Sequence, residues 1–189
     1  MHFKELFAFI SLSLFGAFGR FSEGTCVLPW DGTWYDSAFP DNNVTFDLST
    51  QSVVGWKILA YNTEGTNWVC QEDRQTDKQL LFKSTKNFGS LGLQHLYMFR
   101  CVQWNKLSDH VYQYYVYADE QRNIANQRLY VEPSTTNVTM DTACVTTNPP
   151  ATREFHILVV SNMTDDTPKN SNSADNVRSD CRKLDRRSN

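Results

Sequence analysis

Hydrophobic and aromatic residues recur in short runs through residues 30–132, with almost no helical periodicity. Within a run such as residues 44–48, apolar and polar residues alternate, which is the pattern of a strand with one buried face. In the run 53–61, alternation places Val54, Trp56, Ile58 and Ala60 on one face. Gly, Asn and Ser separate the runs at about ten-residue spacing, so the pattern predicts antiparallel sheet joined by turns.

Nine strands are predicted in all. Their ranges are 32–39, 44–48, 53–61, 66–71, 79–83, 96–105, 110–118, 128–132 and 155–160. Eight or nine antiparallel strands are enough to close a small barrel or to form two packed sheets. We therefore expect an all-β domain over residues 26–160, either a barrel or a sandwich.

Aromatic side chains make up 13% of the chain and concentrate in the predicted strands. Each large ring can bury about 150–250 Å², which a small β domain needs for its stability. The residues expected to line the core or a ligand cavity are Trp34, Trp56, Trp68, Phe82, Phe99 and Tyr114. Core packing is the more frequent reason for aromatic residues at strand spacing.

The first residues have the features of a secretory signal peptide. Lys4 precedes an apolar run from Phe7 to Phe18, and Ala17 and Gly19 occupy the −3 and −1 positions of a cleavage site. The run is shorter than the roughly 20 apolar residues that span a bilayer. We expect residues 1–19 to be removed and the protein to be secreted without a membrane span; a cut after Gly24 is the alternative.

Five cysteines follow the signal peptide, and an oxidising compartment favours their pairing. No two of them form a C-x-x-C pair, so the spacing does not indicate a metal site. Four cysteines lie in the predicted domain and allow three connectivities, of which we favour Cys26–Cys144 with Cys70–Cys101. Cys181 is then left over, available for an intermolecular disulfide or for a small-thiol cap.

Polar chemistry dominates the surface and the end of the chain. Three Asn-x-Thr sequons, at Asn43, Asn137 and Asn162, predict exposed glycosylation sites. Residues 161–189 contain hardly any apolar side chains, so we expect a disordered tail. Its basic residues are interpreted as solvated rather than as a polyanion site. The net charge of −3 gives no bulk attraction to nucleic acid or to an acidic membrane.

Catalytic patterns are lacking in the sequence. The histidines His95, His110 and His156 accompany no nucleophile or ligand motif, and no phosphate loop or Gly-x-Ser-x-Gly is found. His95 and His110 bracket two strands and could meet, but we expect both on the surface. The carboxylates, among them Asp36 and Asp47, do not form a recognisable acid–base pair. The chain is therefore interpreted as a non-enzyme without a cofactor.

One short motif, Gly32-Thr33-Trp34-Tyr35, resembles the Gly-x-Trp motif on the first strand of lipocalins. That resemblance implies a barrel whose tryptophan packs across the closed end and which carries a small hydrophobic ligand. Tyr117-Ala118-Asp119-Glu120 matches the lipocalin Thr-Asp-Tyr only at the central Asp. The helix that follows the barrel in lipocalins has no counterpart in the Thr-, Asn- and Pro-rich residues after Pro133.

A wider pattern covers residues 26–160. Its elements are Cys26-x-x-Pro29-Trp30, Gly32-x-Trp34, Gly55-Trp56, Trp68-x-Cys70, Leu81-Phe82-Lys83-Ser84, Phe99-Arg100-Cys101, Tyr112-x-Tyr114-Tyr115 and Cys144. This order resembles secreted and cell-surface invertebrate domains of unknown function. The resemblance implies an extracellular, disulfide-bonded module and carries no site residues.

The sequence thus predicts a secreted, non-catalytic binding module. Its partner would be an extracellular protein, a glycan or a small apolar ligand. A lipocalin-like carrier is the main alternative, and a hydrolase with a dispersed site has less support.

Overall fold

The structure is a computed structural model that describes residues 26–90 and 93–161. The expected signal peptide, nearly all of the expected tail, Asn162 and Cys181 lie outside the described residues. Helices are short: α1 covers Met140–Ala143, and the 3-10 turns η1 and η2 cover Arg122–Ile124 and Thr152–Glu154. No helix in the described part of the chain is long and apolar enough to cross a membrane.

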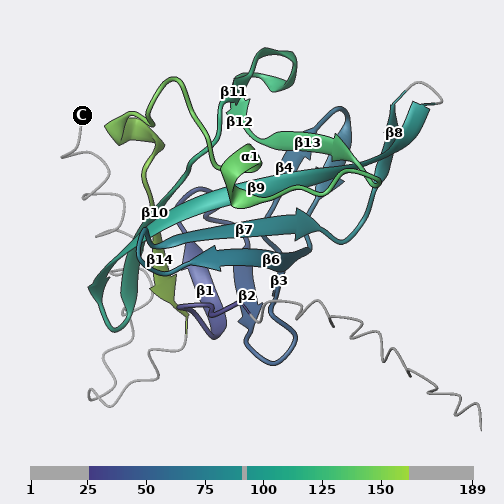
Figure 1. The fold of residues 1–189 in the computed structure, drawn as a ribbon. Helices are drawn as coiled ribbons and strands as arrows, with labels where there is room; N and C mark the ends of the chain where they lie inside the picture. The colour runs from purple at the N-terminus through teal and green to yellow at the C-terminus, as the bar shows by residue number, and fades with distance from the viewer. Residues whose placement is uncertain (1–25, 91–92, 162–189) are drawn as a thin grey trace, which may run out of the picture.

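Eight antiparallel strands close into a barrel (Figure 1). In chain order they are β1 (Gly32–Asp36), β2 (Asn43–Asp47), β3 (Ser52–Val54), β6 (Trp68–Arg74), β7 (Gln79–Ser84), β9 (Leu93–Ser108), β10 (Val111–Val116) and β14 (His156–Val160). Each pairs with the next along the chain, and β14 returns to pair with β1. Trp34 faces Val44 of β2 and Val160 of β14, so the register at the closing seam is continuous. The predicted all-β class is confirmed, as an up-and-down barrel.

Six short strands complete the fold. They are β4 (Ile58–Ala60), β5 (Thr63–Gly65), β8 (Phe88–Ser90), β11 (Glu120–Gln121), β12 (Gln127–Arg128) and β13 (Tyr130–Pro133). Strand β9 is long enough to pair twice along each edge: with β8 and β7 on one side, and with β13 and β10 on the other. It therefore extends beyond the barrel wall, as Figure 1 shows.

The predicted single strand over residues 53–61 is wrong. Gly55 has a φ of +86°, which ends β3 at Val54 and separates it from β4. A Cβ at Gly55 would lie 2.5 Å from the backbone oxygen of Asn43, so only glycine fits there. Because the chain turns at Gly55, Val54 is exposed while Trp56, Ile58 and Ala60 are buried.

Two hydrophobic clusters lie on opposite sides of the barrel wall. The larger fills the barrel and includes Trp30, Trp56, Trp68 and Phe82. The smaller covers the outer side of β7 and β9, where Leu81, Phe99 and Cys101 pack against Met140 and Ala143 of α1. Alternation along a strand sends neighbouring residues to opposite faces, so Phe82 belongs to one cluster and Leu81 to the other.

The predicted disulfide pairing is wrong. The structure pairs Cys26 with Cys70 and Cys101 with Cys144, at Cα–Cα distances of 6.1 and 5.3 Å. Cys70 belongs to the cluster inside the barrel, and Cys101 to the one outside, so these two cannot meet. The predicted Cys26–Cys144 disulfide would join the two ends of the domain. The pairing of β14 with β1 already joins them.

Candidate functional site: the mouth of the barrel

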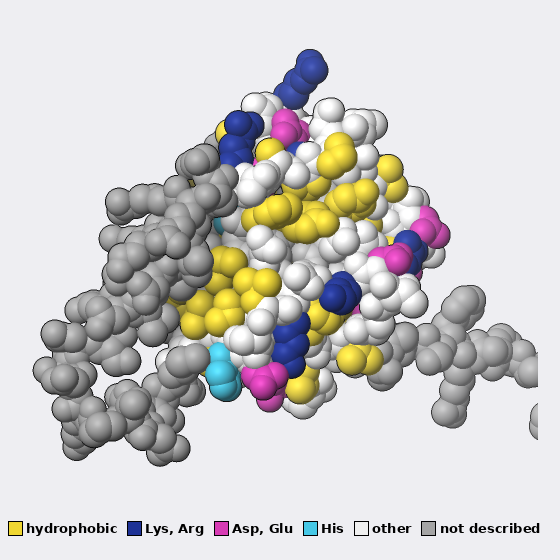
Figure 2. All heavy atoms as spheres, turned by 90° about the vertical axis from the view of Figure 1, so that its left-hand side faces the viewer, with side chains coloured by type: hydrophobic (Ala, Val, Ile, Leu, Met, Phe, Trp, Pro, Cys, Tyr) yellow, Lys and Arg dark blue, Asp and Glu magenta, His cyan; other side chains and the backbone are white. Residues whose placement is uncertain are grey.

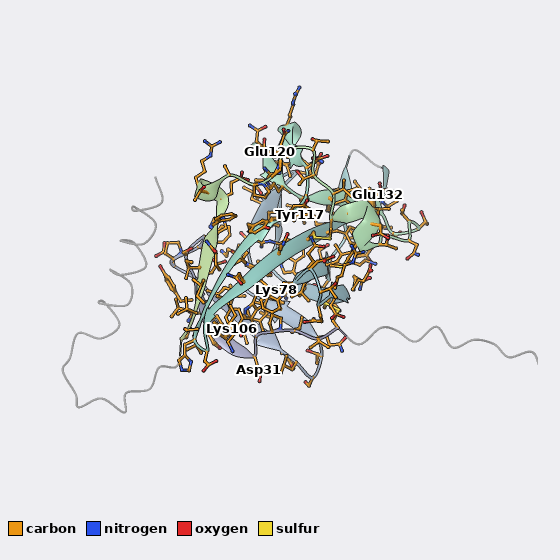
Figure 3. The ribbon with its side chains drawn as sticks, turned by 60° about the vertical axis from the view of Figure 1, so that its left-hand side comes forward. Asp31, Lys78, Lys106, Tyr117, Glu120 and Glu132 are labelled. Atoms are coloured by element: carbon orange, nitrogen blue, oxygen red, sulfur yellow. A yellow bond between two sulfur atoms is a disulfide. The ribbon has the colours of Figure 1, made fainter. Side chains whose placement is uncertain are left out.

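The two ends of the barrel differ in chemistry. At one end, aromatic rings close the interior: Trp34 lies 5.6 Å from Tyr112, and Trp30 lies 5.9 Å from Tyr112 and 6.2 Å from Trp104 between ring centroids. The Trp34 indole donates to the carbonyl oxygen of Asp31 at 2.8 Å. The other end, which we call the mouth, is formed where β1 and β10 end and β14 begins. Figure 3 shows these ends apart, with Asp31 at one and Glu120 beside the other.

A buried carboxylate lies beneath the mouth. Asp36 is fully buried, and its Oδ2 accepts hydrogen bonds from the indole of Trp56 at 2.9 Å and the hydroxyl of Tyr114 at 2.7 Å. Its Oδ1 accepts from the backbone N–H of Ala38 at 2.9 Å. Burial, and then the charge of Asp36, raises the pKa of Tyr114 well above 10. The phenol thus stays a hydrogen-bond donor.

Arg100 is the second charge of this cluster. It comes from the inward face of β9 and is only 4% exposed, with its guanidinium carbon 4.1 Å from the centre of the Trp56 ring. Its Nε and Nη1 have no hydrogen-bond acceptor within the described part of the chain. Burial lowers the pKa of Arg100, and the neighbouring Tyr114 and Asp36 oppose that shift. The buried guanidinium therefore lies against the Trp56 ring with Tyr114 and Asp36 nearby, and two of its nitrogens lack an acceptor among the described residues.

A second buried arginine, Arg128 of β12, is fully satisfied. Its guanidinium donates five hydrogen bonds, equal to its number of N–H groups. Two go to Glu154, at 2.6 and 3.2 Å, and the others reach Ala118, Thr146 and Glu120. This network ties β12, β11 and η2 together. The Arg128 side chain is structural, whereas that of Arg100 keeps donors to spare.

A pocket of about 490 Å³ opens at the mouth. Its apolar lining comes from Ala38, Phe39, Ile58 and Val116. The polar lining residues described are Lys57, Arg100, Asn126, Gln127, Arg128, Arg153, Glu154 and His156. Four of these are basic and one is acidic, so basic side chains outnumber acidic ones in the lining. Its size lies in the range of small-molecule sites.

An aromatic face forms the outer side of β10 and β14. Tyr115 packs 4.9 Å from Phe155 and 6.3 Å from Tyr117 between ring centroids, and all three rings are half-buried. Figure 2 shows hydrophobic side chains gathered on the side of the molecule to which these strands belong. Burial raises the pKa of Tyr115. This face is a second candidate contact surface, but it contains no buried donor without a partner.

The structure separates most of the residues that the sequence offered for chemistry. His95 and His110 are both exposed; His95 lies near the start of the 16-residue β9 and His110 just beyond its end, so they do not meet. Asp47 accepts hydrogen bonds from Ser49 and Thr50 in an exposed turn. Of the histidines in the described residues, only His156 lines the mouth. No group of three His, Cys, Asp or Glu side chains in residues 26–90 and 93–161 is placed to hold a metal ion.

Five of the six predicted core residues lie inside the barrel, and two of the sequons are exposed. Trp34, Trp56, Trp68, Phe82 and Tyr114 are buried inside the barrel. Phe99 is buried in the outer cluster instead. Asn43 and Asn137 are exposed, as glycosylation requires.

Sequence reasoning missed the cluster of Asp36, Arg100 and Arg128. The alternation in β9 would have placed Arg100 on the same face as Met98 and Val102, which is an inward face. A charged residue in that register is the signal that was available.

Comparison with protein-family models, with curated proteins and with solved structures finds no match for the chain.

Proposed function

We propose that the chain is a secreted, non-catalytic binding module that takes its ligand at the mouth of a filled barrel. The observation that carries this proposal is the packing of aromatic rings around Trp56 inside the barrel. Trp56 contacts Trp30, Phe46, Phe82 and Tyr114, with ring centroids 5.3–6.3 Å apart. Rings at these spacings leave no room between them for an enclosed ligand. The ordered polar groups are instead at the mouth.

The rest of the molecule supports a role outside the cell. Two intramolecular disulfides fasten the chain, which is typical of proteins that fold in an oxidising compartment. The exposed sequons at Asn43 and Asn137 suit glycosylation during secretion. With the signal-peptide pattern of residues 1–19, these features favour export.

A lipocalin-like carrier is the second candidate. The order of the eight strands and the position of Trp34 at the ring-closed end favour it. The filled interior argues against it, because a carrier encloses its ligand. A hydrolytic role has less support, since Glu154, the acid at the mouth, is occupied by Arg128 and its pKa is lowered mainly by that hydrogen bond.

Native mass spectrometry of the protein secreted by eukaryotic cells separates the first two candidates. An enclosed apolar ligand survives buffer exchange, whereas a ligand at an open mouth exchanges out. We expect the mass of the glycosylated chain with its disulfides and no retained molecule. A stoichiometric apolar molecule, released only on unfolding, would replace the proposed module with a carrier.

A further inference from the structure

We propose that the mouth of the barrel binds a small organic carboxylate, with the anionic head directed to Arg100 and the apolar body against Phe39, Ile58 and Val116. This inference rests on the binding role proposed for the mouth and names its ligand class. The pocket, the buried charge at its wall and the apolar lining carry it together.

The two buried arginines differ in how many of their N–H groups have an acceptor in the protein. Arg128 uses all five of its N–H groups on protein acceptors, so it has no donor left for a ligand. Arg100 lines the same pocket with two guanidinium nitrogens that lack an acceptor. Leaving buried donors unpaired is costly, and more so for a charged group. A ligand that supplies an acceptor for these nitrogens therefore removes part of this cost, and that gain favours its binding.

Other buried donors without a described partner do not mark a site of this kind. They are the indole Nε1 atoms of Trp30 and Trp104, and both belong to the aromatic end of the barrel. Both are neutral. Among the described residues with such donors, only Arg100 combines a formal charge with a place in the wall of a pocket.

The sign of the ligand's charge follows from the residues that line the pocket. Among the lining residues, Lys57, Arg100, Arg128 and Arg153 stand against one acid, Glu154, and that acid is paired with Arg128. Asp36, which is not a lining residue, offsets part of the charge of Arg100 from beneath the pocket. Lys57 is also paired, with Glu64 at 3.4 Å, but this pair is exposed and screened by solvent. The field in the pocket thus favours an anion and disfavours a cation.

The class of anion follows from burial and shape. Arg100 offers a single buried guanidinium whose charge is partly offset by Asp36, which matches a monoanionic carboxylate better than a phosphate dianion. A planar guanidinium also fits the plane of a carboxylate. The apolar lining and a volume of about 490 Å³ suit a ligand with a hydrocarbon body rather than a bare ion.

The test is calorimetric titration of the secreted, disulfide-bonded protein with octanoate, 1-octanol, octylammonium and inorganic phosphate. Octanoate should bind, 1-octanol should bind at least ten-fold more weakly, and octylammonium should not bind. Phosphate should bind more weakly than octanoate because it has no apolar body. Equal affinity for octanoate and 1-octanol, or phosphate binding as tight as octanoate, would overturn the proposal.

Variants assign the effect to Arg100. Arg100→Met should weaken octanoate binding at least ten-fold, and Arg100→Lys should recover part of it because the charge is retained. Lys78→Gln, an exposed lysine near the aromatic end of the barrel, is the matched charge control and should leave the affinity unchanged. Near-UV circular dichroism checks the fold; if R100M is misfolded, the comparison of R100K with the wild type decides. Unchanged octanoate affinity in a folded variant at position 100 would refute the assignment.

The outcomes are separable from those of the proposed function. If the wild-type protein does not bind octanoate, the proposed carboxylate site is refuted. The native mass of the secreted protein still tests whether the barrel interior holds a ligand. A molecule retained inside the barrel removes the module, whatever octanoate does at Arg100.

Discussion

Replacing Asp36 with Asn should strongly destabilise the barrel. The amide keeps one carbonyl oxygen for Trp56 and Tyr114 but turns the other acceptor into an N–H₂ group facing the N–H of Ala38. At least one buried donor then loses its acceptor, at about 1–3 kcal/mol. The hydrogen bonds from Trp56 and Tyr114 change from a charged to a neutral acceptor, at about 1 kcal/mol each. Arg100 also loses a nearby negative charge. Because these contributions overlap, we expect about 3–5 kcal/mol in total.

Urea unfolding followed by tryptophan fluorescence measures this loss. With a denaturant slope of about 2 kcal/mol/M, the midpoint should fall by about 2 M. Asp109→Asn is the control: it removes an exposed carboxylate paired with Lys106, and its midpoint should barely move. D36N combined with R100M should cost less than the sum of the two single variants. A D36N midpoint equal to that of D109N, or strict additivity, would refute the coupling of the two buried charges.

Three further predictions concern the scaffold. Trp34→Ala should cost about 3–5 kcal/mol of unfolding free energy, because a buried ring is truncated; an unchanged urea midpoint would exclude a core role for Trp34. Gly55→Ala should destabilise the folded protein by at least about 1 kcal/mol from the positive φ alone, and by more through the contact of the new Cβ with the Asn43 oxygen. Gly89→Ala has open space around the new Cβ and should be nearly neutral, so equal melting temperatures for the two variants would contradict this. Hydrogen bonds from Ser49 and Thr50 lower the pKa of Asp47 to about 2, so its stabilising effect is present above its unfolded pKa and is lost as the pH falls through about 2; a carboxyl-carbon NMR titration giving a value near 4 would show that the turn is not formed.

The fold class was predictable because alternation and turn residues are local signals. All nine predicted strand ranges overlap strands of the barrel or of its β13 extension, but the range 53–61 is broken at Gly55 into β3 and β4. That break depends on the approach of the Asn43 backbone from another strand, which no local pattern reports. Strand alternation shows which residues share a face of a strand. It does not show whether that face points into the barrel or packs against an element outside it. This is why Phe99 and Cys101 could not be assigned to the outer cluster from the sequence.

The candidate site was less predictable than the scaffold. Asp36, Arg100 and Arg128 are isolated in the sequence, and their roles depend on which partners the closed barrel brings to them. Nothing in the sequence distinguishes the saturated Arg128 from the unsatisfied Arg100. The disulfide pairing failed for the same reason, since it depends on α1 covering the outer side of β9.

Binding at the mouth of the barrel, and not inside it, can be tested directly by following the tryptophan side chains. The chain contains five tryptophans, whose indole N–H resonances can be followed separately by ¹⁵N NMR during an octanoate titration. We expect the Trp56 resonance to shift, because the Arg100 guanidinium lies over the Trp56 ring and the indole N–H donates to Asp36. The resonances of Trp34 and Trp104, at the aromatic end of the barrel, should not shift. Shifts of equal size at Trp34 and Trp104, or none at Trp56, would contradict the claim.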